Sequence, residues 1–343
     1  MDKKSLIGLG LIAAILITWL ALTGLSKEQI ARNKQIKDSI ELATKSAQIA
    51  EEAKAAAKKI AAANDTTTKV VLSDSLIQLQ KNSIYKDFAV SVSGKKEVVT
   101  IENENIKAFI STKGGNVEKV ILKNYKRYGQ SEPLVLFDAD STAQYLQFEA
   151  YANNMRFTTD SFYFKPSSIT ETVSGNSTKS IILKLETSNP GSYIEYIYSL
   201  KGNDYMLDYD VNFVGMQNIL SSKNNHVTMH WSQALPSQEK HITKEREAAT
   251  AYFNQTNEGV DYINARKSEE KLLNEDNIKW VSFKQHFFNS TLIADGEFLK
   301  EGSFVKTSEN PESKYVKTIT TELSIPFKHS SSEKFGMSFY FGP

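Results

Sequence analysis

Two histidines, His226 and His230, are the first residues whose type and spacing could do chemistry. Val227, Met229 and Trp231 alternate with them, which is the two-residue period of a β-strand. In a strand, residues four apart share a face but lie about 13 Å from each other, too far to bind one metal ion. On a helix the same spacing would form a pair of metal ligands, but the alternation favours the strand. We therefore interpret both histidines as surface residues rather than metal ligands.

The other titratable residues do not form a recognisable catalytic motif. His241 falls in a charged segment, and His286, beside two phenylalanines, is interpreted as a structural histidine. Carboxylates two apart, such as Asp208 and Asp210, are typical of exposed strand faces; a glycosidase pair could form from such residues in space, but the sequence does not reveal one. The sequence contains no H-E-x-x-H, G-x-S-x-G or phosphate-loop motif. We expect a protein that is not an enzyme and that has no cofactor and no metal site.

The composition excludes several classes of partner and chemistry. The 343 residues carry 41 basic and 40 acidic side chains, so no net field exists to attract nucleic acid. The chain has no cysteine, which excludes disulfides, cysteine-bound zinc and thiol redox chemistry. Its 15 tyrosines and 18 phenylalanines indicate a β-rich core, because aromatic side chains suit a pleated, half-buried surface. The length allows one large domain or two ordinary ones, in addition to an anchor.

The N-terminal region contains an uncharged, apolar run from Leu6 to Leu25, about twenty residues that would span roughly 30 Å as a helix. Lys3 and Lys4 precede it, and the positive-inside rule keeps that basic end in the cytoplasm. We predict that residues 1–26 are a transmembrane signal anchor and that the rest of the chain lies on the outer side. A cleaved signal peptide is the alternative; its apolar core would be shorter, about 7 to 15 residues. A lipoprotein anchor is excluded because there is no cysteine.

Two connecting segments follow the predicted anchor. Residues 27–63 are rich in Ala, Lys, Glu and Gln and contain no Gly or Pro, which predicts a helix about 55 Å long. Its apolar stripe consists mainly of alanine, so we interpret it as a solvated spacer, with a weak coiled coil as the alternative. Short polar residues then predict a linker over residues 64–96, with one further short helix around Ser73 to Asn82.

The period of the sequence changes from helical to two after Val98, and residues 97–343 are predicted to form one β domain. In Tyr205–Phe213, large apolar residues alternate with Asp and Asn, as expected for a strand with one wet face. A charged helix is expected around Ser237 to Ala249 and a short helical turn near Lys267 to Leu273. So many strands with few helices predict a mainly β, antiparallel sandwich. The other predicted strands are Val98–Glu102, Ile106–Ser111, Val117–Tyr125, Pro133–Phe137, Phe162–Lys165, Lys179–Thr187, Ser192–Leu200, His226–Gln233, Lys279–Phe287, Thr291–Ala294, Ser303–Lys306, Tyr315–Ile325 and Lys334–Phe341.

One segment, Trp280 to Ala294, is unusually rich in aromatic residues and has the pattern W-x-x-x-K-Q-x-F-F-x-S-x-L-I-A. It resembles a stretch in the large periplasmic domain of the YidC/Oxa family of membrane protein insertases, in their Gram-negative form. Two further segments agree with that resemblance. Ser111–Tyr125 is similar to the domain's early hairpin, where two glycines make the turn, and Ser338–Pro343 is similar to the Y-x-G-P sequence that ends the domain. The motif residues, all interpreted as structural, are Gly114, Gly115, Trp280, Phe283, Lys284, Phe287, Phe288, Gly342 and Pro343.

The resemblance implies a β-supersandwich similar to the galactose mutarotases, located in the periplasm of a bacterium and tethered to its inner membrane. It implies a role in integrating and folding nascent proteins into that membrane, alone or with the Sec translocon. The implied partners are the lipid bilayer, nascent membrane proteins and accessory subunits of the translocon, but no nucleic acid. The family's insertase core of transmembrane helices follows this domain and is not in this chain, so we expect a tether and a docking domain.

The aromatic segment from Trp280 to Phe288 is expected to be mostly structural core, because dense aromatic residues are more often buried than exposed for recognition. The alternative is a surface that contacts peptides. Two other functional classes also stay open. A membrane-anchored carbohydrate-binding or mutarotase-like protein would need a glutamate base and a histidine acid that converge in a cleft. A structural envelope protein would oligomerise through the alanine-rich helix.

Overall fold

The computed structural model describes residues 66–151 and 155–343. Helix α3 (Thr66–Tyr85) begins this part and leads into the 3-10 helix η1 (Lys86–Ser91). The short helix expected around Ser73 to Asn82 is therefore present but longer at both ends. The contacts within the chain divide it into two units, residues 1–78 and 79–343.

The predicted anchor at residues 1–26 and the spacer helix at residues 27–63 lie outside the described residues. Within residues 66–151 and 155–343, no helix combines the length and the apolar character that a membrane span needs. The position of the anchor therefore stays a prediction from the sequence.

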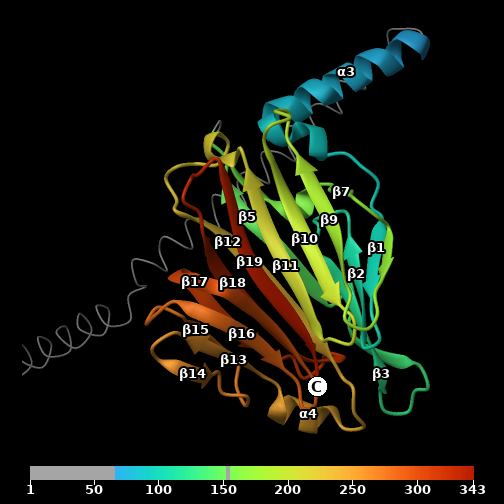
Figure 1. Cartoon of the computed structure of the whole chain (residues 1–343), viewed down its shortest axis with the longest axis vertical. Helices are drawn as coiled ribbons and strands as arrows, with labels where there is room; N and C mark the ends of the chain where they lie inside the picture. The colour runs from blue at the N-terminus through green and yellow to red at the C-terminus, as the bar shows by residue number, and fades with distance from the viewer. Residues whose placement is uncertain (1–65, 152–154) are drawn as a thin grey trace, which may run out of the picture. The chain divides into compact units, whose positions relative to one another are not determined.

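Residues 98–343 form β-strands joined by loops and three short helices (Figure 1). The helices are η2 (Thr159–Ser161), η3 (Met216–Asn218) and α4 (Ile242–Ala248). The strands are β1 (Val98–Glu102), β2 (Ile106–Ser111), β3 (Val117–Lys126), β4 (Pro133–Phe137), β5 (Thr142–Glu149), β6 (Arg156–Thr158), β7 (Lys165–Pro166), β8 (Thr170–Thr172), β9 (Thr178–Glu186), β10 (Tyr193–Lys201), β11 (Met206–Val214), β12 (His226–Pro236), β13 (Thr250–Gln255), β14 (Gly259–Tyr262), β15 (Glu269–Leu272), β16 (Ile278–Lys284), β17 (Asn289–Ser308), β18 (Tyr315–Pro326) and β19 (Ser332–Gly342).

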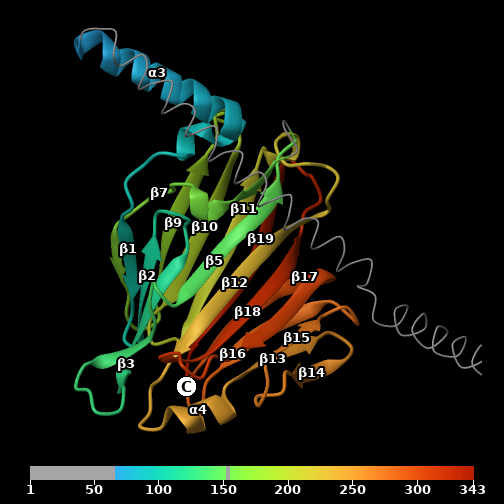
Figure 2. The ribbon, with the colours of Figure 1, turned by 180° about the vertical axis from the view of Figure 1, so that it is seen from behind.

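Two sheets account for these strands. The smaller has the order β4-β3-β2-β1-β8, and the larger runs β6-β5-β12-β18-β17-β19-β11-β10-β9-β7 with β13, β14, β15 and β16 as a branch from β17. Figure 2 shows the small sheet, with β1 and β2, beside the long strands of the large one. Neighbouring strands are antiparallel except β1 and β8, where Thr100 pairs with Thr170 in parallel. The prediction of a mainly β, antiparallel sandwich is confirmed.

The buried residues of both sheets form one hydrophobic cluster. In β10, Ile194, Tyr196 and Tyr198 are buried, while the residues between them are partly exposed. This alternation is what the two-residue period dictates, and burial of the inward face at about 25 cal/mol per Å² stabilises the sandwich. Across the core, Trp231 of β12 stacks on Phe283 of β16 with ring centroids 3.9 Å apart.

Some local predictions were wrong. The helical turn expected near Lys267 to Leu273 is instead strand β15, which pairs with β17, Glu269 opposite Thr307. This backbone pairing outweighs the helix propensity of the Glu and Lys residues in the segment. The separate strands expected at 291–294 and 303–306 are parts of the single strand β17. Strand β5 was not predicted, because the inward position of Gln144, a buried residue, hides the alternation.

The charged helix expected from Ser237 to Ala249 is present as α4 but begins later. The buried carboxylate of Glu245 explains this. It accepts hydrogen bonds from the hydroxyl of Ser237 and from the backbone N–H of Gln238, at 2.6 Å for the latter. The segment before the helix is therefore folded back onto α4 instead of extending it.

Candidate functional site

The two histidines on β12 have separate environments. His226 is half-buried, and this burial lowers the pKa of its imidazole. The ring of His230 stacks on Tyr145 at 4.4 Å, and its Nδ1 lies 3.4 Å from the carboxylate of Glu322, the residue paired with it on β18. Within residues 66–151 and 155–343, no three His, Asp or Glu side chains are grouped to hold a metal ion.

A mutarotase-like mechanism would require a histidine and a glutamate that converge in a cleft. Two histidine–glutamate pairs occur among the described residues, His286–Glu239 and His230–Glu322. The His230–Glu322 pair is the one that includes a candidate histidine of β12. The two side chains contact each other directly, across neighbouring strands. Neither of the cavities described below includes them. Because an acid and a base must face the substrate from two sides, this pair has no room for a sugar between its members.

The two aspartates expected on an exposed strand face, Asp208 and Asp210 of β11, are paired with the neighbouring strand β19. Asp208 accepts a hydrogen bond of 2.8 Å from the hydroxyl of Ser338, and Asp210 lies 2.8 Å from the ammonium of Lys334. These contacts are cross-strand pairs that stabilise the sheet.

Gly114 and Gly115 make the turn between β2 and β3 with φ values of +89° and +68°. A Cβ atom on Gly115 would lie 2.6 Å from Cδ2 of the buried Tyr196. The carbonyl of Gly115 also accepts a hydrogen bond of 2.7 Å from the hydroxyl of Tyr198. The turn therefore closes over the buried tyrosines of β10, and both the backbone conformation and the close approach require glycine.

The C-terminal motif closes the large sheet. Gly342 pairs with Asn289 of β17, and a Cβ atom on it would lie 2.7 Å from the hydroxyl of Tyr340. That hydroxyl donates a hydrogen bond of 2.9 Å to the carbonyl of Pro343. These two motif residues contact strand neighbours and nothing that resembles a ligand site.

The aromatic segment from Trp280 to Phe288 is only partly core. Phe283 is fully buried, and Phe288 is 8% exposed and lies edge-on to Tyr125 at 5.3 Å. Phe287, in contrast, is 60% exposed, so the expectation of a core role is wrong for this residue. The reason is the tight turn between β16 and β17, where Gln285 donates to the carbonyl of Phe288 and directs Phe287 outward. Phe287 then stacks on His286 at 4.3 Å.

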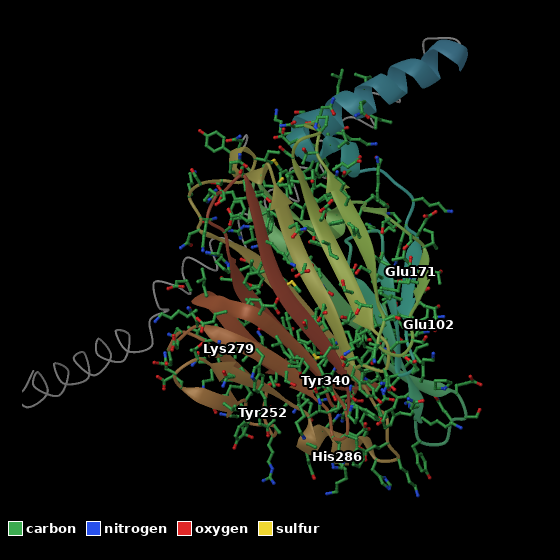
Figure 3. The ribbon with its side chains drawn as sticks, viewed as in Figure 1. Glu102, Glu171, Tyr252, Lys279, His286 and Tyr340 are labelled. Carbon is green, nitrogen blue, oxygen red and sulfur yellow. The ribbon has the colours of Figure 1, made fainter. Side chains whose placement is uncertain are left out.

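Trp280 is also not part of the core; it lines a shallow groove of about 380 Å³ on the outer face of β13, β16 and β17. Strand register creates this groove, because Tyr252 pairs with Ser282 and Trp280 pairs with Ile293. Figure 3 shows Tyr252 and Lys279 on this part of the molecule. The lining residues are Tyr252, Trp280, Ser282, Lys284, Asn289, Thr291 and Ile293.

The polar groups on the groove floor bond to one another. The hydroxyl of Thr291 lies 2.7 Å from that of Ser282 and 2.9 Å from Oδ1 of Asn289. At the rim, Tyr252 packs against Tyr262 of the edge strand β14 with ring centroids 5.3 Å apart. Lys284 forms no ion pair among the described residues. The groove therefore offers large apolar rings with one nearby cation, which suits apolar side chains of an extended chain.

A second, larger cavity of about 520 Å³ lies on the outer face of β1, β2 and β3. The aromatic residue in its lining is Phe109. The ammonium groups of Lys107 and Lys119 lie 5.6 and 5.2 Å from the centroid of the Phe109 ring. Glu118, also in its lining, is paired at 2.7 Å with Lys96. The aromatic surface here is thus covered by lysine side chains, and the Tyr252–Trp280 groove is the better candidate for binding.

The sequence analysis did not predict the groove, because it did not place Tyr252 on a strand next to Trp280. Strand β13 was not predicted, although its residues Thr250–Gln255 contain the aromatic pair Tyr252 and Phe253 between short loops. Those two aromatic residues were the available signal.

Comparison with known proteins agrees with the sequence motifs. A family model described as the YidC periplasmic domain matches residues 98–343. The chain is 32% identical over 345 residues to the membrane protein insertase YidC of Bacteroides fragilis, and 30% identical over 343 residues to that of Porphyromonas gingivalis. Each alignment covers 100% of this chain and 51% of the relative, so the chain spans about half the length of these relatives.

Several solved structures similar to this chain are described as mutarotases or as related to them. One is a galactose mutarotase related enzyme from Lactobacillus acidophilus, with 13% identity, a TM-score of 0.41 and coverage of 72% of this chain and 98% of that chain. Another is a putative aldose 1-epimerase from Escherichia coli K12, with 10% identity, a TM-score of 0.40 and coverage of 72% and 99%. The family model matches residues 98–343, which is more than half of the chain, and the chain therefore belongs to the YidC family, through its periplasmic domain.

Proposed function

We propose that this chain is the tether and extracytoplasmic part of a membrane protein insertase of the bacterial inner membrane. One observation carries the proposal: the family match over residues 98–343, in a chain that aligns from end to end with proteins named as membrane protein insertases. Family membership implies a membrane-anchored protein with a periplasmic domain. In the proposed layout, residues 1–26 are the single anchor, residues 27–63 a spacer and residues 64–96 a connection to the β domain at 97–343.

The proposed role of the β domain is to dock extended, apolar protein segments in the Tyr252–Trp280 groove. The rings of Tyr252 and Trp280 lie on one open face, and Ile293 completes the apolar lining. Burying the side chains of a passing segment against these rings yields about 25 cal/mol per Å², without any specific hydrogen bond. Such a surface suits clients of varied sequence. Nascent membrane proteins, and accessory subunits of the Sec translocon, are the proposed occupants.

A crosslinking experiment in the full-length insertase tests the docking role. A photoreactive phenylalanine derivative replaces Tyr252, and a ribosome-bound, radiolabelled nascent membrane protein is presented to membrane vesicles that contain the protein. We expect an adduct with the nascent chain from position 252. The matched control is Tyr151, which is 67% exposed and lies outside the groove. Equal adduct yields from both positions would contradict groove docking.

A deletion tests whether the domain is accessory. Residues 98–343 must be removed as a whole, because strands distant in the chain pair with each other, as β12 does with β18, and a partial deletion would leave strands without their partners. An accessory docking role predicts reduced insertion of a reporter membrane protein by the remaining insertase. Complete loss of insertion, with the truncated protein still present in the membrane, would contradict it.

Carbohydrate binding is the second candidate, because Trp280 and Tyr252 form an open aromatic surface on which a sugar ring could stack. One feature of the groove floor disfavours it: the single hydroxyl proton of Thr291 is already shared between Oγ of Ser282 and Oδ1 of Asn289, which leaves one donor fewer for sugar hydroxyls. Calorimetric titration of the chain with galactose and glucose separates the two candidates. Binding in the millimolar range or tighter, abolished by Trp280→Ala, would favour the carbohydrate function.

A further inference from the structure

We propose that one end of the β domain binds the surface of a lipid bilayer rich in anionic lipids. Three segments form this end: the loop between β3 and β4, the segment before α4, and the turn between β16 and β17. We refer to it as the aromatic-basic end, defined by the residues Lys126, Arg127, Tyr128, Lys240, Lys284 and Phe287. The inference goes beyond the docking role, because it concerns a lipid partner and a surface that shares only Lys284 with the Tyr252–Trp280 groove.

Direct contacts hold the three segments together. The backbone N–H of Tyr128 donates to the carbonyl of Gln238 at 2.9 Å, and the imidazole of His286 lies 2.8 Å from the carboxylate of Glu239. The side-chain amide of Gln238 also donates to the carbonyl of Val135 at 2.9 Å. The loop and the turn are therefore fixed on either side of the same short segment. Figures 1 and 3 show α4, His286 and the C-terminus at one end of the domain.

The apolar part of this end consists of two exposed aromatic side chains. Tyr128 is 61% exposed and Phe287 is 60% exposed. They project from separate loop tips, and neither lines one of the two cavities. A protein partner is usually bound by a continuous groove or patch, whereas aromatic side chains on separate tips suit the headgroup region of a bilayer.

The charge of this end complements an anionic surface. Lys126, Arg127, Lys240 and Lys284 form no ion pair among the described residues. The same segments, residues 126–132, 237–249 and 284–288, hold six Lys and Arg side chains against four glutamates, so their net charge is positive. Of the glutamates, Glu239 lies against His286, Glu247 pairs with Lys244, and Glu245 is buried. Basic side chains within a Debye length of anionic headgroups are attracted to them, and long lysine stems can reach the headgroups while the aromatic tips insert.

The predicted anchor would give the whole domain a high effective concentration at the bilayer surface. The absence of cysteine from the chain allows a direct test with single labels. In the full chain, a polarity-sensitive fluorophore is attached to Phe287→Cys or Tyr128→Cys, and the protein is reconstituted in phosphatidylglycerol-containing vesicles whose headgroups carry a spin-label quencher.

The matched control is Tyr151→Cys. Tyr151 is equally exposed, at 67%, and donates its backbone N–H to the carbonyl of Ile219, at the opposite end of the domain from Gly342. We expect strong quenching and a blue shift at positions 287 and 128, severalfold larger than at position 151. Quenching that is equal at all three positions, or absent at 287 and 128, would overturn the proposal. The same labels in phosphatidylcholine vesicles show whether the contact needs anionic lipid.

A charge variant tests the electrostatic part. Lys126→Gln together with Arg127→Gln is expected to reduce the equilibrium constant for contact about tenfold in anionic vesicles and to weaken its salt dependence. The control pair, Lys86→Gln with Lys328→Gln, removes the same charge from exposed positions elsewhere and should leave contact unchanged. Thermal unfolding of each variant verifies that the fold is intact. Equal loss of contact in both pairs would refute specific binding by the aromatic-basic end.

Discussion

Substitution of Gly115 by alanine is expected to destabilise the domain strongly, through two separate costs. The first is conformational, because Gly115 has φ of +68°, where an L-residue costs roughly 1–2 kcal/mol. The second is steric: the new Cβ would lie 2.6 Å and 2.9 Å from two ring atoms of Tyr196. Such overpacking in a dense core costs about 1–3 kcal/mol. The sum is about 2–5 kcal/mol of unfolding free energy.

Tyr196 cannot easily move away from the added methyl group. It is buried, its hydroxyl donates to Thr159 at 3.2 Å, and its ring packs against Phe164 at a centroid distance of 4.7 Å. A shift of the turn would also lengthen the hydrogen bond from Tyr198 to the carbonyl of Gly115. The steric cost is therefore expected near the upper part of its range.

Thermal unfolding of the full chain, followed by circular dichroism, measures the effect. For a domain of this size each kcal/mol lowers Tm by roughly 2–4 °C, so Gly115→Ala should lower it by roughly 4–20 °C. The matched control is Gly175→Ala, since Gly175 has φ of +61° but no atom within 4 Å of its added Cβ. The control isolates the conformational cost of about 1–2 kcal/mol. If Gly115→Ala is no more destabilising than Gly175→Ala, the reasoning about Tyr196 is wrong.

Three further predictions follow from buried and exposed groups. Lys317→Met should lower the free energy of unfolding, measured in urea, by about 2–4 kcal/mol. The buried ammonium of Lys317, whose pKa is lowered by burial, donates to the carbonyls of Ala249 at 2.9 Å and of Arg246 at 3.4 Å. The substitution would leave both carbonyls unpaired. Burial lowers the pKa of His226, so the unfolded chain takes up a proton first and stability should fall as pH drops below about 6.5; His226→Gln should flatten that part of the pH–stability curve. Phe287→Ser should change the unfolding free energy by no more than about 0.5 kcal/mol, because the side chain is 60% exposed, yet abolish quenching at a Tyr128→Cys label in anionic vesicles.

The sandwich was predictable because its strands alternate strictly. In β12, inward Val227, Met229 and Trp231 are buried and the histidines between them are only partly buried, as the two-residue period predicts. Prediction failed where an inward position is polar, as at Gln144 of β5, or where backbone pairing overrides helix propensity, as in β15. These failures depend on partners distant in the chain, which local periodicity does not contain.

The groove was not predictable for a related reason. It is formed by strand register, which places Tyr252 of β13 beside Ser282 and Trp280 beside Ile293 of β17. None of these pairings involves neighbours in the sequence. The aromatic density of the Trp280–Phe288 segment was visible, but density alone does not tell which rings face inward.

In the Trp280–Phe288 segment, the side chains that point into the core are structural, and those that point outward are candidates for function. A core role accounts for Phe283, which stacks under Trp231, and for Phe288, which lies against Tyr125. It does not account for the outward residues of the same motif: Phe287 is 60% exposed, and the partly buried Trp280 and Lys284 line the groove and not the core. The motif is therefore better explained by two requirements, one for packing and one for binding at the surface. Substitutions at the outward positions should change contacts with peptides or lipids while leaving Tm nearly unchanged, and substitutions at the inward positions should do the reverse.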